Sequence, residues 1–195
     1  RYPDLRLYIR EVAPRDLRGE LLMGRLDVIL TQLPEGGGDL TTRRLFREPL
    51  VLAMPDDHPL VVREEVTEAD LADLNVLSLG PDYALHAQIA ALCHQHGAFI
   101  ARDYEGTSLD AIRQMVGMGM GVALLPRLYA KSEIDSRSSN VVVRPFRRST
   151  VMRSLGLVWR SAASPVMFAR LSDVIQEAAR EHLQAGKAPV ILDET

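Results

Sequence analysis

The stretch GTSLDAIRQMVGMGMGVALLP, residues 106–126, predicts a helix that leads into a buried strand. Thr107 and Ser108 carry hydroxyls where a helix can start. Asp110 follows Thr107 at the three-residue spacing of a capping box, with Asp in place of Glu. Apolar side chains then recur at helical spacing, and we expect them to form one buried stripe: Leu109, Ile112, Met115 and Val116.

The second half of this stretch ends the helix and begins a strand. Three glycines terminate the helical pattern, namely Gly117, Gly119 and Gly121. The apolar run 122–125, closed by Pro126, is typical of a buried strand. A capped helix, a glycine turn and a buried strand make half of an α/β unit, and the free N–H groups at such a helix start can hold a small anion. We therefore expect the function to depend on this helix start.

The rest of the chain alternates apolar runs with amphipathic segments, which indicates an α/β fold. The run 26–34 is nearly continuously apolar, so we expect a strand covered on both faces, as in a parallel sheet. Further strands are expected at 5–12, 75–80, 99–104, 141–146 and 154–160, with two short strands around Glu48 and Pro49. Helices are expected at 16–23, 67–74, 82–96 and from Ser164 onward.

The composition is that of a globular protein without a strong charge of either sign. The 195 residues are 47% hydrophobic, enough for one large core or two small ones. The net charge of −3 argues against strong nucleic-acid binding by this chain itself. Cys93 is the single cysteine, which excludes an internal disulfide and favours a reducing compartment. No apolar run approaches the roughly 18 residues of a membrane span, so we expect a cytoplasmic protein without a membrane partner.

Five segments, in order, resemble the effector-binding domain of LysR-type transcriptional regulators: GRLDVILTQLP, LFREPLVLAMPDDHPL, LSLG, the 106–126 stretch and SLGLVWR. The similarity in sequence and spacing covers residues 1–185. Within that family, GTSLDAIRQMV, VWR and the loop before HAQIAALCHQHGA are most similar to the OxyR-like branch of peroxide sensors. The resemblance implies a regulatory domain that senses a small polar or anionic effector, or oxidative stress.

The resemblance also implies an architecture. It is an α/β fold with two lobes of the periplasmic-binding-protein type II kind and a ligand cleft between them. The first lobe would hold residues 1–76 plus 152–185 and the second residues 77–151, followed by a loose tail at 186–195. In this family an N-terminal winged helix-turn-helix DNA reader, a linker helix and a first strand and helix precede a sequence like RYPDLRL, so these parts are expected to be absent here. Family members assemble as dimers and tetramers.

Four candidate ligand-binding residues lie at the start of the 106–126 helix and on the facing wall of the implied cleft. The family places its ligand over this helix start, which gives Thr107 and Ser108 a ligand-binding role; the alternative is that they only cap the helix. Tyr83 and His86 stand where similar proteins have the other wall of the cleft. The alternatives are a half-buried packing tyrosine and a surface histidine.

Further candidates lie on strands of the predicted first lobe. Thr31 and Gln32 end the 26–34 run, and side chains at the carboxyl end of a parallel strand face the crevice where α/β proteins bind ligands. Alternatively they simply meet solvent. Arg160 ends SLGLVWR and matches an arginine near the sensing site of OxyR-like proteins, where it could hold a carboxylate bidentately. The alternative is a structural ion pair.

Cys93 is a redox candidate by resemblance alone. OxyR-like sensors use a peroxidatic cysteine before this helix and a second cysteine nine residues later, and the pair forms a disulfide on oxidation. Here Cys93 stands at the second position and Ala84 at the first, either naturally or by engineering. A thiol on the apolar face of a helix is more often an inert core group, because the reactive species is the thiolate.

Other function classes receive less support from the residues. His94 and His96 are two apart on a helix and face different directions, so we expect no metal site. No Ser-His-Asp order, P-loop or GxGxxG is present, so we expect neither an enzyme nor a bound cofactor. The alternative function is a solute-binding protein of a transport system, which shares the two-lobed cleft but predicts a secretory signal and a monomer.

Overall fold

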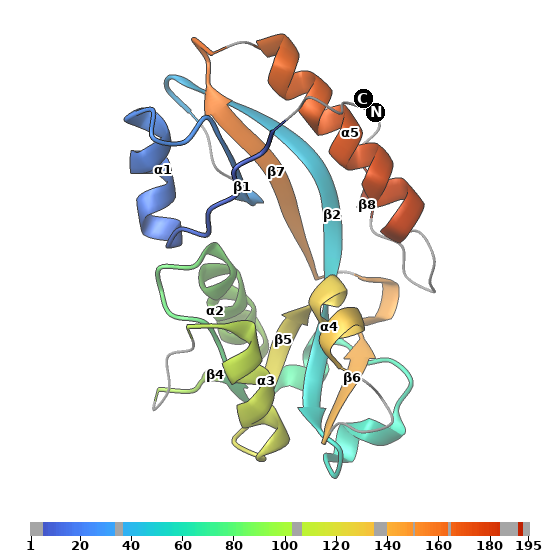
Figure 1. The fold of residues 1–195 in the computed structure, drawn as a ribbon. Coiled ribbons are helices and arrows are strands. Elements are labelled where there is room, and N and C mark those ends of the chain that lie inside the picture. Colours follow the sequence, from blue (N-terminus) through green and yellow to red (C-terminus); the bar gives the residue numbers. More distant parts are fainter. Residues whose placement is uncertain are drawn as a thin grey trace.

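The computed structural model describes residues 6–33, 37–102, 107–134, 140–149, 151–163, 165–183 and 191–192, which form a mixed sheet covered by helices (Figure 1). The strands are β1 (Val28–Leu33), β2 (Leu40–Pro55), β3 (Asn75–Leu77), β4 (Phe99–Ile100), β5 (Val122–Pro126), β6 (Val141–Pro145), β7 (Met152–Arg160) and β8 (Ile191–Leu192). The helices are α1 (Pro14–Leu22), α2 (Ala84–His96), α3 (Leu109–Gly117), α4 (Arg127–Glu133) and α5 (Pro165–Leu183). Short 3₁₀ helices span Pro59–Val62, Glu68–Leu71 and Arg147–Ser149.

β2 connects the two halves of the sheet, whose strand order is β1-β7-β2-β5-β3-β4. Its first part pairs with β7 and β8, and its second part, from Leu50 onward, pairs with β5 and β6 (Figure 1). Instead of the two short strands expected around Glu48 and Pro49, the structure has one strand of 16 residues. The charge of Glu48 does not end the strand because Arg153 of β7 pairs with it.

Pro49 does not interrupt the ladder between β2 and β7 either. Pro49 stands opposite Met152, and the next pair along, Leu50 and Val151, is joined by a bond from the Leu50 N–H to the Val151 carbonyl at 2.8 Å. Hydrogen-bonded and non-hydrogen-bonded pairs alternate in an antiparallel ladder, so Pro49 occupies a position whose N–H would point away from β7. The missing N–H of proline therefore costs no bond to β7.

The half of the sheet built from β1, β7 and the first part of β2 has a helix on each face. α1 lies on one side of these strands and α5 on the other (Figure 1). The core under α1 consists of Leu21, Ile29, Leu40 and Val158, and the core under α5 of Leu45, Leu157, Trp159 and Phe168. Successive side chains of β7 thus alternate between the two cores, as the period of a strand requires.

The other half of the sheet contains the largest core. All five residues of β5 are buried, which confirms the strand expected after the glycine turn. The same core cluster includes Leu50–Met54 of β2, Val66, Leu71 and Val76 together with residues of α2, α3 and β5. β2 carries the chain into this half of the sheet at Leu50.

Two expectations for the N-terminal region are wrong. Residues 6–12 form no strand, and Leu7, Tyr8 and Ile9 are 61%, 89% and 86% exposed. Alternating apolar residues become a strand only where a neighbour supplies hydrogen bonds, and no described strand lies beside them. β1 is not a parallel strand covered on both faces: it pairs antiparallel with β7, ends the strand order, and leaves Leu30 58% exposed.

The helices expected at 16–23 and 82–96 are confirmed as α1 and α2, whereas the helix expected at 67–74 is only the short 3₁₀ helix Glu68–Leu71. α2 ends at Gly97, whose φ of 73° is the left-handed conformation that glycine favours. Of the predicted strand 99–104, the structure has β4 and leaves 103–106 outside the described residues. The tail expected at 186–195 includes β8, which pairs with Phe46 and Arg47 of β2; its other residues lie outside the described part. None of the described helices combines the length and apolarity that crossing a bilayer would require.

Candidate functional site

The start of α3 is capped one residue later than the sequence predicts. The Oγ of Ser108 accepts the N–H of Ala111 at 3.2 Å, so Ser108 is the N-cap and Thr107 precedes the helix. Asp110 consequently lies within the first helical turn and not at the capping-box position. Both Thr107 and Ser108 are exposed, so their polar groups are accessible to a ligand.

The starts of α2 and α3 are joined by a hydrogen bond. Tyr83 is the residue before α2, and its hydroxyl donates to the carbonyl of Thr107 at 3.1 Å. The N-termini of two helices are thereby held next to each other. The partial positive charge of each favours a small anion or a polar oxygen. The structure thus brings together three of the predicted site residues: Tyr83, Thr107 and Ser108.

Asp110 contributes a negative charge to the same region. Its Oδ1 accepts the Tyr129 hydroxyl at 2.7 Å and lies 3.9 Å from Nε of Arg113. Burial, with a smaller effect of the bond to Asp110, raises the pKa of Tyr129 to about 12, so this hydroxyl keeps its proton at neutral pH. The carboxylate is therefore paired on the protein side, and the Ser108 end of the helix remains open.

His86 does not join Tyr83 in this group. Its Nδ1 lies 2.7 Å from the carbonyl oxygen of Leu79 and 3.3 Å from Oγ of Ser78. Because a carbonyl can only accept, Nδ1 donates this hydrogen bond to Leu79. His86 lines a cavity of about 510 Å³ together with Cys93, His94 and residues 98–102. The two residues predicted for this wall of the cleft therefore lie in different places. Tyr83 bonds at the start of α3, and His86 lies beside β3 and β4.

Gln32 makes a contact between the two halves of the sheet, but for a reason that the sequence did not predict. β1 is antiparallel to β7, so the rule for carboxyl ends of parallel strands does not apply to it. Nε2 of Gln32 donates to Oε1 of Gln88 on α2 at 3.0 Å. Thr31 stands opposite Gly156 in β7.

Arg160 is held by the backbone near the end of α1. Its Nη1 donates to the carbonyls of Leu21 and of Leu26, the latter at 2.8 Å, and its Nη2 lies 3.8 Å from Asp27. These contacts favour the structural alternative, because a guanidinium that satisfies two carbonyls has fewer donors for a ligand.

Cys93 is 2% exposed on the apolar face of α2. Burial raises the pKa of its thiol to about 11, so the reactive thiolate is scarce at neutral pH. Ala84, nine residues earlier, is exposed at the helix start. In the described part of the chain, no three His, Cys, Asp or Glu side chains are grouped closely enough to hold a metal ion.

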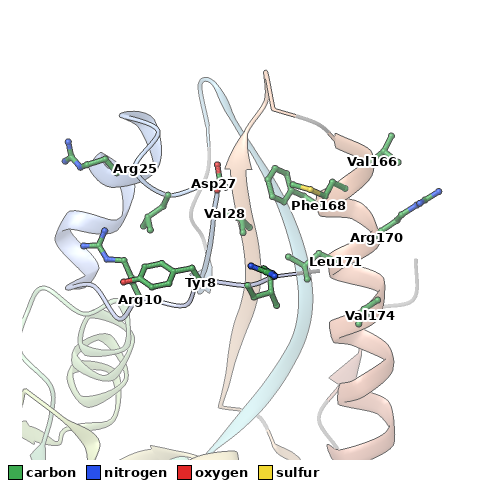
Figure 2. Close-up of a pocket in the computed structure, with 14 residues that line it drawn as sticks. Tyr8, Arg10, Arg25, Asp27, Val28, Val166, Phe168, Arg170, Leu171 and Val174 are labelled. Atoms are coloured by element: carbon green, nitrogen blue, oxygen red, sulfur yellow. The ribbon is translucent and has the colours of Figure 1, made fainter. Parts of the chain in front are cut away.

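The larger cavity, of about 690 Å³, lies away from the starts of α2 and α3. It is lined by residues 6–8 and Arg10, by residues 25–28 and by one face of α5; Figure 2 shows Tyr8 and Arg10 across from Phe168 and Leu171. Neither this cavity nor the smaller one includes Thr31, Gln32, Tyr83, Thr107, Ser108 or Arg160.

Sequence reasoning missed two polar residues that organise this region. Gln88 bonds to Gln32 and to the Met152 carbonyl, and Tyr129 bonds to Asp110. A signal for Gln88 was available: it follows Leu85 by three residues and precedes Leu92 by four, so it is a polar residue beside the apolar stripe of α2. Tyr129 has no such signal, because its partner is set by how α4 lies against α3.

Comparisons with known proteins identify the family. The family model described as LysR substrate binding domain matches residues 1–180. The DNA-binding transcriptional dual regulator OxyR of Escherichia coli K12 is 34% identical over 159 residues, which are 82% of this chain and 52% of that protein. This chain therefore spans about half the length of that curated relative.

Solved structures agree with this assignment. The oxidised form of OxyR superposes with a TM-score of 0.80 at 32% identity, covering 93% of this chain and 85% of that chain. The H2O2-bound C206S mutant of Corynebacterium glutamicum OxyR gives a TM-score of 0.82 at 30% identity, covering 92% and 57%. The chain belongs to the LysR substrate-binding-domain family, has the periplasmic-binding-protein type II fold, and is an OxyR-like regulatory domain.

Proposed function

We propose that this domain receives the signal for a DNA-binding transcriptional regulator, and that the signal is a small polar or anionic ligand, or peroxide, bound where α2 and α3 begin. The observation that carries the proposal is the bond from Tyr83 to the Thr107 carbonyl, which holds the two helix starts together at an exposed Ser108. The aligned peptide dipoles of both helix starts favour an anion at this place.

Thiol-disulfide chemistry is not part of the proposal. An intramolecular disulfide needs two cysteines, and the chain has one. Its thiol is buried, and Ala84 stands where the resemblance places the peroxidatic cysteine. The C206S mutant of C. glutamicum OxyR is described as H2O2-bound although one cysteine has been replaced, which supports testing peroxide as a bound ligand.

The remaining parts of the proposal concern the whole regulator. DNA would be bound through a winged helix-turn-helix outside this chain, which is consistent with the net charge of −3. The regulator would act in the cytoplasm as a dimer or tetramer and would bind its effector without converting it. Ligand binding would favour one arrangement of subunits and so reorient the DNA readers.

We also propose two lobes, with a boundary different from the one that the sequence suggested. The packing supports crossing points near Pro49 on β2 and Val151 before β7, because residues 50–151 share one core cluster. The larger cavity would then be the place of a further strand of the first lobe and not a ligand site. Two observations support this: among the described residues no strand pairs with the outer edge of β1, and the exposed Leu7 and Tyr8 line that cavity.

The experiment is a thermal-shift titration of the 195-residue chain with sulfate, phosphate, acetate, benzoate and hydrogen peroxide. Binding to the folded state raises the melting temperature in proportion to the logarithm of ligand concentration. We expect at least one of these probes to raise it in the wild type. Ser108→Asp should abolish the response to an anion, since aspartate keeps the helix capped but places a negative charge at the site.

Thr67→Ala is the control for a perturbed helix start away from the proposed site. Thr67 is the N-cap of the 3₁₀ helix Glu68–Leu71, where its hydroxyl and its N–H both donate to Oδ2 of Asp70 at 2.8 Å. This variant should lower the melting temperature and leave the ligand response intact. The proposal is wrong if no probe shifts the wild type, or if Ser108→Asp responds to the anions as the wild type does.

A further inference from the structure

We propose that the side chain of Gln88 couples the position of α2 to the two neighbouring strands of the first half of the sheet, β1 and β7. Its amide bonds to both strands: Nε2 donates to the carbonyl of Met152 on β7 at 2.7 Å, and Oε1 accepts from Nε2 of Gln32 on β1 at 3.0 Å. Gln88 belongs to α2, whose other inward side chains lie in the core of the second half. The inference rests on this geometry and not on the identity of a ligand.

The Met152 carbonyl needs a partner from outside the sheet. Because the Val151 carbonyl accepts from Leu50 of β2, the Met152 carbonyl points to the opposite side, toward β1. The ladder between β1 and β7 ends with Leu33 opposite Ser154, so the described part of β1 does not reach Met152. A backbone carbonyl in this position costs stability unless it is hydrogen-bonded, and Gln88 supplies the bond.

The two bonds fix the orientation of the Gln88 amide. A carbonyl acceptor at Met152 demands the NH2 group, which leaves Oε1 for Gln32. Both bonds are partly buried, so water competes with them less than at the surface. A second contact between the halves, the ion pair of Arg15 with Asp82 at 3.1 Å, is exposed at both side chains and holds more weakly.

The consequence is that α2 cannot shift along or around its axis without disturbing β7 at its first residue. Met152 lies next to Arg153, which pairs with Glu48 where β2 and β7 pass between the halves of the sheet. Ala84, the first residue of α2, is one helical turn before Gln88. A change at the start of α2 would therefore be transmitted through Gln88 to β2 and β7, the strands that connect the two halves of the sheet.

The test is a coupling experiment by NMR on the 195-residue chain, without ligand or DNA. Ile89→Val removes one buried methylene from α2, which shifts the helix slightly at small cost in stability. The readouts are the carbonyl ¹³C shift of Met152 and the amide ¹⁵N shift of Arg153, which share one peptide bond. We expect Ile89→Val to change both shifts in the wild type and in Gln95→Leu, a control on the exposed face of α2. In a Gln88→Leu background the change should be lost.

Gln88→Glu is a second variant that tests the same bond if Gln88→Leu disturbs the fold. Glutamate has the same shape and can still accept from Gln32, but its carboxylate cannot donate to the Met152 carbonyl. It should therefore abolish the response of Met152 and Arg153 as leucine does. The inference is overturned if the response to Ile89→Val persists in either Gln88 variant, or if the wild type shows none. Because no ligand is present, these outcomes do not depend on those of the thermal-shift titration.

Discussion

Glu48 of β2 and Arg153 of β7 form an ion pair at the level where both strands pass from one half of the sheet to the other. Glu48 is fully buried, and the Arg153 side chain is 20% exposed. Nε of Arg153 donates to Oε1 of Glu48 at 2.6 Å, and its Nη2 contacts the same oxygen. Oε2 accepts the N–H of Leu128 at 3.1 Å, so the pair also holds the start of α4.

Breaking this pair from the arginine side should be strongly destabilising. Arg153→Met leaves a carboxylate buried without a countercharge, which costs on the order of 3–5 kcal/mol of unfolding free energy. Urea denaturation measures it, with Arg15→Ala as a control in an exposed pair, expected to cost at most about 1 kcal/mol. The double variant Glu48→Leu with Arg153→Met should recover most of the loss. Equal costs for Arg153→Met and Arg15→Ala would contradict this account.

The sequence predicted α3, the glycine turn and β5 because each of them depends on residues close together in the chain. Ser108, Gly119 and Gly121 carry local conformational signals, and Ile112 and Val116 carry the periodicity. The continuity of β2 could not be predicted in the same way, because the partner of Glu48 is 105 residues away. The edge position of β1 likewise depends on which strands lie beside it. Among the site residues, Tyr83, Thr107 and Ser108 come together, whereas His86 and Arg160 bond elsewhere for tertiary reasons.

Replacing the true N-cap of α3 should destabilise the protein more than replacing its neighbour. Ser108→Ala removes the acceptor for the Ala111 N–H and should cost about 1 kcal/mol. Thr107→Ala should lower the unfolding free energy by only a few tenths of a kcal/mol, as is usual for an exposed site. The urea midpoints of the two variants compare them directly. A larger loss of stability in Thr107→Ala than in Ser108→Ala would contradict this and would support the capping box that the sequence predicts.

The two glycines of the turn before β5 should differ in their tolerance of alanine. A Cβ on Gly121, at φ 154°, would meet the carbonyl oxygen of Asn75 at 2.6 Å. A Cβ on Gly119, at φ 76°, would meet nothing within 4 Å. We expect Gly119→Ala to cost about 1 kcal/mol from the backbone alone and Gly121→Ala to cost distinctly more. Melting temperatures measured side by side test this order, and the reverse order would contradict the packing of this turn against β3.

Cys93 should react slowly in the folded protein and weaken it at high pH. With a pKa near 11, its thiolate is about a hundredfold scarcer than for an ordinary thiol near 9, so iodoacetamide should label it about that much faster after unfolding. Between pH 9 and 11 the unfolded chain loses this proton and the folded chain keeps it, so stability falls as pH rises.

The Cys93→Ala variant isolates this effect from that of Tyr129, whose raised pKa acts in the same direction at higher pH. Urea denaturation at several pH values should show a shallower loss of stability between pH 9 and 11 in Cys93→Ala than in the wild type. Identical slopes, or rapid labelling of the folded protein, would show that the thiol is more accessible than its burial indicates.

The central claim is that the signal arrives at the starts of α2 and α3 and does not require the thiol. The most direct measurement is isothermal titration calorimetry of the wild type, Cys93→Ala and Ser108→Asp with the anion that gives the largest thermal shift among sulfate, phosphate, acetate and benzoate. The account predicts equal affinity for the wild type and Cys93→Ala, and no detectable binding to Ser108→Asp. Loss of binding in Cys93→Ala, with binding retained in Ser108→Asp, would contradict it.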